Sequence, residues 1–119
     1  MPRTGALRSS DLGQAGFENV MGVFEWHVAD DVAIWENDRP YEIFGRDRAL
    51  GPIGRQEFVT SYILPEDREA FDRQVTHDVT HLNRVTWITR IRRPDASIRW
   101  VEITGSNVEI EERRVGKSV

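Results

Sequence analysis

Two histidines four residues apart, in the stretch "HDVTH" at residues 77–81, are the residues of this chain whose types and spacing come closest to metal chemistry. In the zinc-protease pattern H-E-x-x-H, the two imidazoles lie one helical turn apart and the glutamate reaches the zinc-bound water. Here Asp78 replaces that glutamate and is one methylene shorter. A catalytic zinc also needs a third ligand, and no histidine follows His81. We therefore predict neither a metal site nor a catalytic residue in this stretch.

A predicted helix that begins at Pro65 positions these histidines, because proline is favoured in a first helical turn. Carboxylates follow the proline at once, where the helix dipole favours negative charge. His77 and His81 each lie two residues, or about 200° round the helix, from a position of the apolar stripe. Both are therefore expected to face solvent, and the whole stretch "HDVTH", Asp78 included, is expected to be the exposed end of the helix. The stripe recurs at spacings of four and three and indicates the core-facing side: Phe71, Val75, Val79 and Leu82.

Length and composition indicate one small folded domain. The chain has 119 residues, of which 39% are hydrophobic and 30% charged. The net charge is −4 and no long basic stripe occurs, so binding to nucleic acid is not expected. No cysteine is present, which excludes disulfides, thiolate catalysis, cysteine-ligated metals and thioether-linked chromophores.

The sequence carries no signature of membrane insertion or of an enzyme. Its apolar runs are only a few residues long, and the N-terminus lacks the apolar region of a signal peptide. A cytoplasmic location is the resulting expectation. No Ser/His/Asp order stands out, and "GPIG" at 51–54 lacks the lysine and the preceding strand of a phosphate loop. We therefore expect no catalytic activity of the chain's own.

The order of the predicted elements indicates an α+β fold, because paired strands flank a helical block. Residues 1–10 are expected to be loose, and a short helix is expected from Ser10 to Met21. The chain is thus divided into a flanking segment, 1–19, with a possible cap helix, and a domain, 20–119. Strands are predicted at 22–30, 32–37, 84–93 and 97–110 with a strand start at 115–119, and helices at 38–45, 55–64 and 65–81. Asp30 and Asp31 are predicted to form the turn between the first two strands.

Three stretches of the chain resemble, in order and spacing, the PAS domains of bacterial sensor kinases and other signalling proteins. The stretch "ITRIRRPDASIRWVEITGSNVEI" resembles the C-terminal hairpin of that family, whose pattern reads roughly "yRi.r.dGs.rWv". The stretch "LPEDREAFDRQV" is similar to the start of the family's long helix, and "GVFEWHVADDVAIWENDRPYEIFG" to its opening strands and helix. The resemblance covers about residues 20–116 and implies a five-stranded antiparallel sheet with helices packed on one face.

Three departures from the family pattern stand out. Leu64 replaces the histidine that often precedes the proline, and Ala96 replaces the usual glycine of the hairpin turn. Such a turn often needs a positive φ, which alanine disfavours. The final strand lacks the usual Asp-Ile-Thr ending, so we expect it to be truncated.

The resemblance implies a sensory or dimerising module of a larger signalling protein, such as a histidine kinase, with an effector domain in the same polypeptide. It also implies a pocket between sheet and helices that holds a ligand or is filled by side chains. The cofactor is not defined by the sequence. A haem, ligated by His77 or His81, and a non-covalent flavin are alternatives, as is an interaction module without ligand. The candidate lining residues, which equally suit a plain core, are Trp26, Trp35, Phe44, Phe58, Phe71 and Trp87.

The strand over 97–104 has apolar residues on both faces, with Trp100 on one side and Val101 on the other. Both faces of such a sheet need a cover. Three helices of a small domain can cover one face only, so the outer face is expected to pack against a second copy of the chain or against the N-terminal helix.

Overall fold

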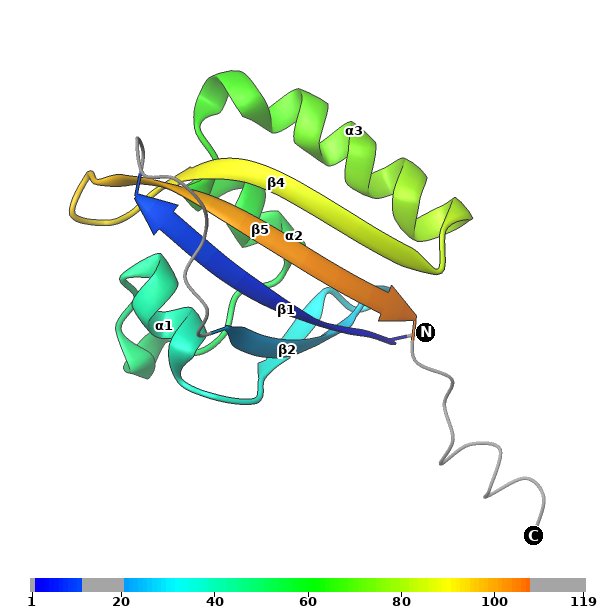
Figure 1. The fold of residues 1–119 in the computed structure, drawn as a ribbon, viewed down its shortest axis with the longest axis horizontal. Coiled ribbons are helices and arrows are strands. Elements are labelled where there is room, and N and C mark those ends of the chain that lie inside the picture. The colour runs from blue at the N-terminus through cyan, green and yellow to red at the C-terminus, as the bar shows by residue number, and fades with distance from the viewer. Residues whose placement is uncertain (1, 12–20, 108–119) are drawn as a thin grey trace, which may run out of the picture.

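The computed structural model describes residues 2–11 and 21–107 of the chain (Figure 1). Its strands form one antiparallel sheet in the order β3-β2-β1-β5-β4, which confirms the predicted α+β class and the five-stranded sheet. The strands are β1 (Pro2–Asp11), β2 (Gly22–His27), β3 (Val32–Trp35), β4 (Arg84–Arg92) and β5 (Ile98–Asn107).

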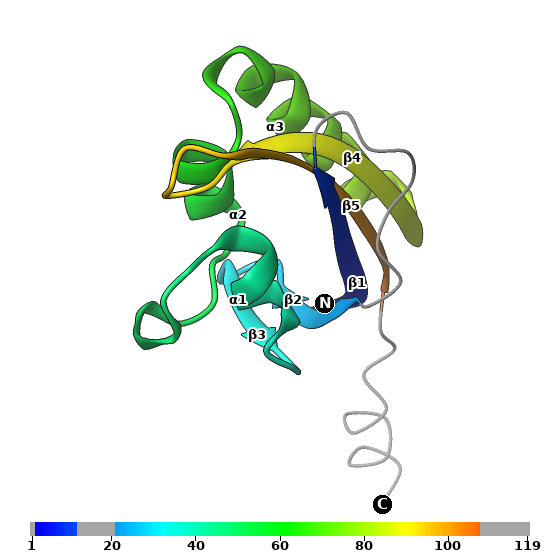
Figure 2. The same cartoon turned by 60° about the vertical axis from the view of Figure 1, so that its left-hand side comes forward.

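The helices lie on one side of the sheet, which curves around them (Figure 2). They follow one another between β3 and β4 in the chain, so the whole helical block is one insertion between two hairpins. The helical elements are α1 (Arg39–Phe44), the 3-10 turn η1 (Arg48–Leu50), α2 (Arg55–Glu57), the π-helical turn η2 (Phe58–Tyr62) and α3 (Pro65–His81).

The central strand β1 corrects the prediction for the N-terminus. Residues 1–10 were expected to be loose, yet β1 pairs with β2 along one edge and with β5 along the other. Its core-facing positions are Arg3, Gly5, Leu7 and Ser9, so no apolar alternation marks it as a strand. The hairpins β2–β3 and β4–β5 each leave one strand edge open, and β1 pairs with both edges. This pairing depends on residues far away in the chain, so the local sequence of β1 does not predict it. The rest of the expected helix over 10–21, and the strand start at 115–119, lie outside the described residues.

Two further predictions about the helices need correction. Residues 55–64 form a short α-helical turn that widens into the π turn, closed by the bond from the Ile63 amide to the Phe58 carbonyl at 3.1 Å. Leu82 was placed on the buried stripe of α3, but the helix ends at His81 and Leu82 is extended and 43% exposed. Phe71 and Val75 are buried as predicted.

The turns between elements follow the chemistry of their residues. Gly45 ends α1 in the left-handed conformation, with φ 63°, as its position after the predicted helix indicated. Ala96 in the β4–β5 turn has φ 74°, so the turn keeps the left-handed conformation although alanine disfavours it. Asp95 stabilises that turn by accepting hydrogen bonds from the amide and the hydroxyl of Ser97.

Candidate functional site

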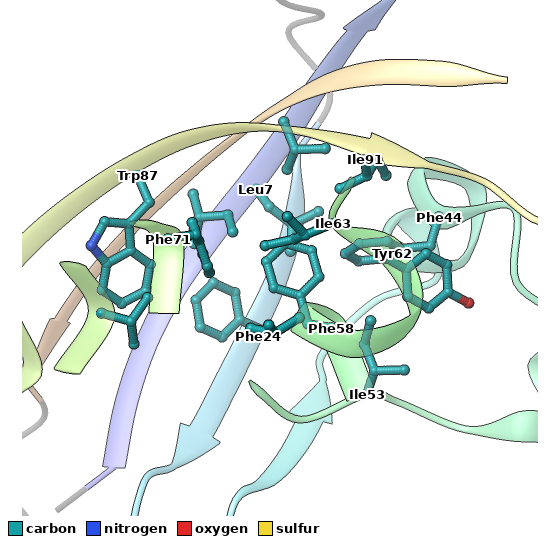
Figure 3. Packing of buried hydrophobic residues seen from close by; sticks show 14 of the residues in the cluster. Leu7, Phe24, Phe44, Ile53, Phe58, Tyr62, Ile63, Phe71, Trp87 and Ile91 are labelled. Carbon is teal, nitrogen blue, oxygen red and sulfur yellow. The ribbon is translucent and has the colours of Figure 1, made fainter. Parts of the chain in front are cut away.

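An apolar cavity of about 80 Å³ lies between the sheet and the helices. Figure 3 shows how buried side chains that line it, among them Leu7, Phe58 and Phe71, pack together. The structure brings all of the aromatic side chains proposed as lining residues around this cavity, although they come from β2, β3, β4 and the helical block. Leu7 of β1 completes the wall on the side of the sheet. The aromatic residues that line it are Trp26, Trp35, Phe44, Phe58, Phe71 and Trp87.

Five of these aromatic rings touch in sequence and make a continuous wall. Trp35 stacks on Phe44 with ring centroids 5.6 Å apart, and Phe44 meets Phe58 edge to face at 5.6 Å. Phe58 then meets Phe71 at 5.5 Å, and Phe71 meets Trp87 at 6.0 Å, both edge to face. Such contacts are favourable beyond simple area burial, so they fix the shape of the cavity.

One cavity tryptophan, Trp26, is held by Asp31 in the β2–β3 turn. Its indole Nε1–H donates to Asp31 Oδ1 at 2.9 Å, and the same carboxylate accepts the backbone amides of Arg55 at 2.5 Å and Gln56 at 3.0 Å. Asp31 thereby caps α2 from a distant part of the chain. Burial acts to raise the pKa of Asp31, but the hydrogen bonds from Gln56, Arg55 and Trp26 outweigh it and hold that pKa below its usual value. We call these residues the Asp31 anchor.

The other cavity tryptophan on the sheet, Trp87, is held by Asp78 of α3. Its Nε1–H donates to Asp78 Oδ2 at 2.8 Å, and His77 Nδ1 lies 3.0 Å from Asp78 Oδ1. These hydrogen bonds, first that of His77 and then that of Trp87, lower the pKa of the buried Asp78 against the opposing effect of its burial. The sequence reading placed this residue on the solvent side with its histidine neighbours, and the structure corrects that view.

Arg3 of the central strand completes this second anchor. Its guanidinium donates to the carbonyl of Leu82 at 2.6 Å and to those of Asp78 and Asn83 at 3.4 Å each. Asp78 is in the last turn of α3 and Leu82 and Asn83 follow its end, so the guanidinium lies at the C-terminal end of the helix, where a cation is favoured. Burial lowers the pKa of Arg3, and the charge of Asp78 partly offsets this. We call Arg3, Asp78, Trp87 and His77 the Asp78 anchor.

Arg55 separates the cavity from a neighbouring surface groove, because both are lined by Arg55 and Trp26. The Arg55 guanidinium reaches across to α3, where it donates to the Asp72 carboxylate and carbonyl, each at 2.9 Å, and to the hydroxyl of Thr76. This bridge ties α2 to α3 above the apolar wall.

The two histidines of "HDVTH" lie away from the cavity. His77 and His81 are exposed, as the helical spacing predicted, and their rings stack on each other with centroids 4.5 Å apart. Neither lines the cavity. Across residues 2–11 and 21–107, no group of three or more histidines and carboxylates is arranged to hold a metal ion.

The size of the cavity bears on the cofactor alternatives. An engineered cavity that binds benzene measures roughly 150 Å³, and sites for drug-sized ligands span roughly 300–1,000 Å³. A haem or a flavin would therefore displace several of the side chains that form the wall. The two candidate haem ligands also lie outside it. The described residues in this arrangement do not fit either group, and haem or flavin binding has no support from the geometry.

The curved five-stranded antiparallel sheet has helices on one face and a small apolar cavity beneath them, and these features define a compact α+β module. The PAS fold family matches residues 33–119, and the chain belongs to this family. PAS domains are in general sensory and signalling modules, regulatory rather than catalytic. Comparison with curated proteins and with solved structures gave no match. Of the helices that the structure describes, none has the length and apolar character needed to span a membrane.

Sequence reasoning found the cavity aromatics but missed the polar residues that hold them. Asp31 was read as a turn residue, Asp78 as a solvent-facing one, and Arg3 as part of a loose terminus. One signal was available for Asp78. It lies three residues after Val75 and seven after Phe71, and this spacing places it on the buried side of the helix. For Arg3 no local signal exists, because its partners are 75 or more positions away in the chain. Trp26 is only five positions from Asp31, but the backbone amides that Asp31 caps are 24 and 25 positions away.

Proposed function

We propose that this domain senses a small apolar molecule that binds in the aromatic cavity. The observation that carries the proposal is the composition of the wall, which consists of aromatic and aliphatic side chains around about 80 Å³. Apolar cavities of this kind stay dry and accept apolar guests. The two tryptophans held by the anchors line the same wall, so a guest that shifts either ring also shifts the helix bonded to it.

The test uses xenon, a small apolar atom, as the probe of the cavity, followed through the indole N–H signals of Trp26 and Trp87 by NMR. Saturable shifts of both signals are expected, and Ala33→Leu should abolish them because Ala33 lines the cavity. Ala49→Leu, at an exposed site of η1, is the matched control and should leave them unchanged. Equal shifts in Ala33→Leu and in the parent chain would contradict the proposal. A visible absorption band in freshly purified protein would instead support the haem or flavin alternative.

We infer a second function, self-association, from the outer face of the sheet. Val23 of β2 and Val32 and Ile34 of β3 are 40%, 52% and 46% exposed there. They point away from the cavity, whereas Ala33 and Trp35, which alternate with Val32 and Ile34 along β3, line the cavity. A second copy of the chain offers the same apolar patch, as a two-fold contact requires. In a larger cytoplasmic signalling protein, such as a histidine kinase, this contact would pair two effector domains.

Sedimentation of the purified chain tests this contact. Ile34→Glu is expected to shift the chain from dimer to monomer at micromolar concentration, since it places a charge in the centre of the patch. Leu50→Glu is the matched control, because Leu50 is 64% exposed on the helical side. A chain that sediments as a monomer before substitution would contradict the contact and leave ligand sensing as the single proposed function.

A further inference from the structure

The two histidines of "HDVTH" make side-chain hydrogen bonds that the sequence did not predict. The Nδ1 atom of His77 lies 3.0 Å from Asp78 Oδ1, and the Nδ1 atom of His81 lies 2.8 Å from the backbone carbonyl oxygen of His77. The two rings stack with their planes 22° apart. Both imidazoles are therefore held in a defined orientation, although both residues are exposed.

The partners of the two Nδ1 atoms determine where each neutral imidazole carries its proton. The hydrogen bonds of His77 and Trp87 hold the pKa of Asp78 below its usual value, so its carboxylate is ionised at neutral pH. A carboxylate and a carbonyl oxygen can only accept a hydrogen bond, so each Nδ1 is the donor and the lone pair is on Nε2. Among residues 2–11 and 21–107, neither Nε2 atom has a hydrogen-bond partner.

This arrangement is the one that metal-ligating histidines share. Such a histidine almost always donates its second ring N–H to a carboxylate or to a backbone carbonyl, which fixes the tautomer and makes the other nitrogen a better ligand. His77 has the carboxylate and His81 has the carbonyl. Their spacing of four residues places the two rings one helical turn apart, as in the pattern H-E-x-x-H.

The position also suits a cation. Zinc lies about 2.0–2.1 Å from a nitrogen ligand, so two nitrogens of one tetrahedral site are roughly 3.3 Å apart. Rings with centroids 4.5 Å apart need only tilt toward each other to reach this separation, and both are exposed. His81 is in the last turn of α3, where the helix dipole favours positive charge.

The number of protein ligands determines what kind of site this is. The sequence predicted no metal site here because a third ligand is missing, and the described part of the chain holds no group of three. Two imidazoles leave positions of a four-coordinate ion to water or to another small ligand. Imidazole suits zinc, nickel and copper, so the class of ion is a divalent transition metal that is bound reversibly.

We propose that His77 and His81 bind a divalent transition-metal ion through their Nε2 atoms, and that Asp78 transmits this binding to the cavity wall. An ion on Nε2 keeps the proton of His77 on Nδ1, so the hydrogen bond to Asp78 Oδ1 is fixed while the ion is bound. The other carboxylate oxygen, Oδ2, accepts the indole N–H of Trp87, which lines the cavity. This inference does not depend on the proposed apolar ligand.

Isothermal titration calorimetry with zinc ions tests the site in the full 119-residue chain. The parent chain is expected to bind one ion, and His77→Ala and His81→Ala are each expected to lose this binding. Both side chains are exposed, so both variants should still unfold cooperatively in urea. His27→Ala is the matched control, because His27 is the third histidine of the chain and lies on β2.

Three results of the calorimetry would overturn the proposal. They are a parent chain that binds no zinc, binding that survives in His77→Ala or His81→Ala, and binding that is lost in His27→Ala. The proposed sensing of an apolar molecule is tested with xenon and without zinc, so the two tests fail independently.

The role of Asp78 is tested by NMR during the zinc titration. The indole N–H signal of Trp87 is expected to shift and to saturate at the dissociation constant that calorimetry gives, whereas that of Trp26, bonded to Asp31, stays in place. Asp78→Asn keeps the shape of the side chain and should weaken zinc binding roughly tenfold or more, the usual effect of losing a partner that orients a metal ligand. Unchanged affinity in Asp78→Asn, or a Trp87 signal that does not move while zinc binds, would overturn the proposal.

Discussion

Two tryptophans on the same cavity wall, Trp26 and Trp87, each donate an indole N–H to an aspartate, yet the two anchors are built differently. Asp31 is part-exposed and accepts two backbone amides of α2. Asp78 is buried, and its carboxylate is bonded to two side chains, those of Trp87 and His77, while the Arg3 guanidinium binds its backbone carbonyl. Backbone donors are fixed by the helix they belong to, whereas side-chain partners can leave. The Asp31 anchor is therefore expected to keep its hydrogen bonds when the cavity changes shape, whereas the Asp78 anchor can exchange its hydrogen bonds.

The comparison predicts the largest loss of stability at the buried anchor. Asp78→Ala leaves the indole N–H of Trp87 and the charge of Arg3 buried without a counterpart, which should lower the free energy of unfolding by about 3 kcal/mol. Urea unfolding measures it. Asp72→Ala on the same helix removes only a half-exposed ion pair with Arg55 and should cost about 0.5 kcal/mol. Equal losses at the two positions would refute the assignment of the buried anchor.

A smaller loss is expected at the Asp31 anchor, because water can reach the groups that it leaves. Asp31→Ala should lower the free energy of unfolding by about 2 kcal/mol through loss of a helix cap and an indole bond. Asp31→Asn keeps one acceptor oxygen and should recover about half of that loss. Urea unfolding again gives the values, with Asp30→Ala as the exposed neighbouring control. A loss in Asp31→Asn as large as in Asp31→Ala would show that charge, and not the acceptor, matters.

The anchors also predict how stability depends on pH. The pKa values of Asp31 and Asp78 are both lowered in the folded state, so the unfolded state binds more protons in acid. Their stabilisation is complete above the pKa of an unfolded aspartate, about 4, and is lost as the pH falls through the lower folded value. The stability difference between the parent chain and Asp31→Asn should therefore be constant near neutral pH and shrink below about pH 4. Urea unfolding across this range checks it, and a difference that grows in acid would have the wrong sign.

The sequence predicted the cavity better than it predicted the anchors, for a physical reason. Aromatic residues such as Trp26 and Trp87 belong to strands in which apolar and polar residues alternate, and this alternation predicts which face of the sheet each side chain is on. The partner of a buried carboxylate is set by how strands and helices come together, which no local period encodes. Asp78 was misread because two exposed histidines surround it, although its own spacing from Phe71 and Val75 marks the buried side.

The fold shows the same division. The hairpin of β4 and β5 and the start of α3 at Pro65 were predicted close to their observed bounds, because turn residues and periodic side chains are local signals. The central strand was missed, since β1 has one apolar residue in the core and its pairing depends on two edges far away in sequence. Arg3, which joins this strand to the Asp78 anchor, was missed with it.

The smallest predicted change in stability comes from glycine substitutions that distinguish backbone strain from the hydrogen bonds of the Asp31 anchor. Asp31 and Ala96 are the two non-glycine residues with positive φ in the described ranges, at 54° and 74°. The alanine side chain forms no hydrogen bond that glycine would lose, and its Cβ is strained at positive φ. Ala96→Gly should therefore relieve that strain. After subtraction of the entropy cost of glycine, the free energy of unfolding should rise by about 0.5 kcal/mol. Asp31→Gly relieves the same strain but removes the acceptor for Trp26 and α2, so it should lower stability. Urea unfolding of the two variants decides the matter. A gain in both would mean that Asp31 is only a strained turn residue, and the contrast between the two anchors would then rest on Asp78 alone.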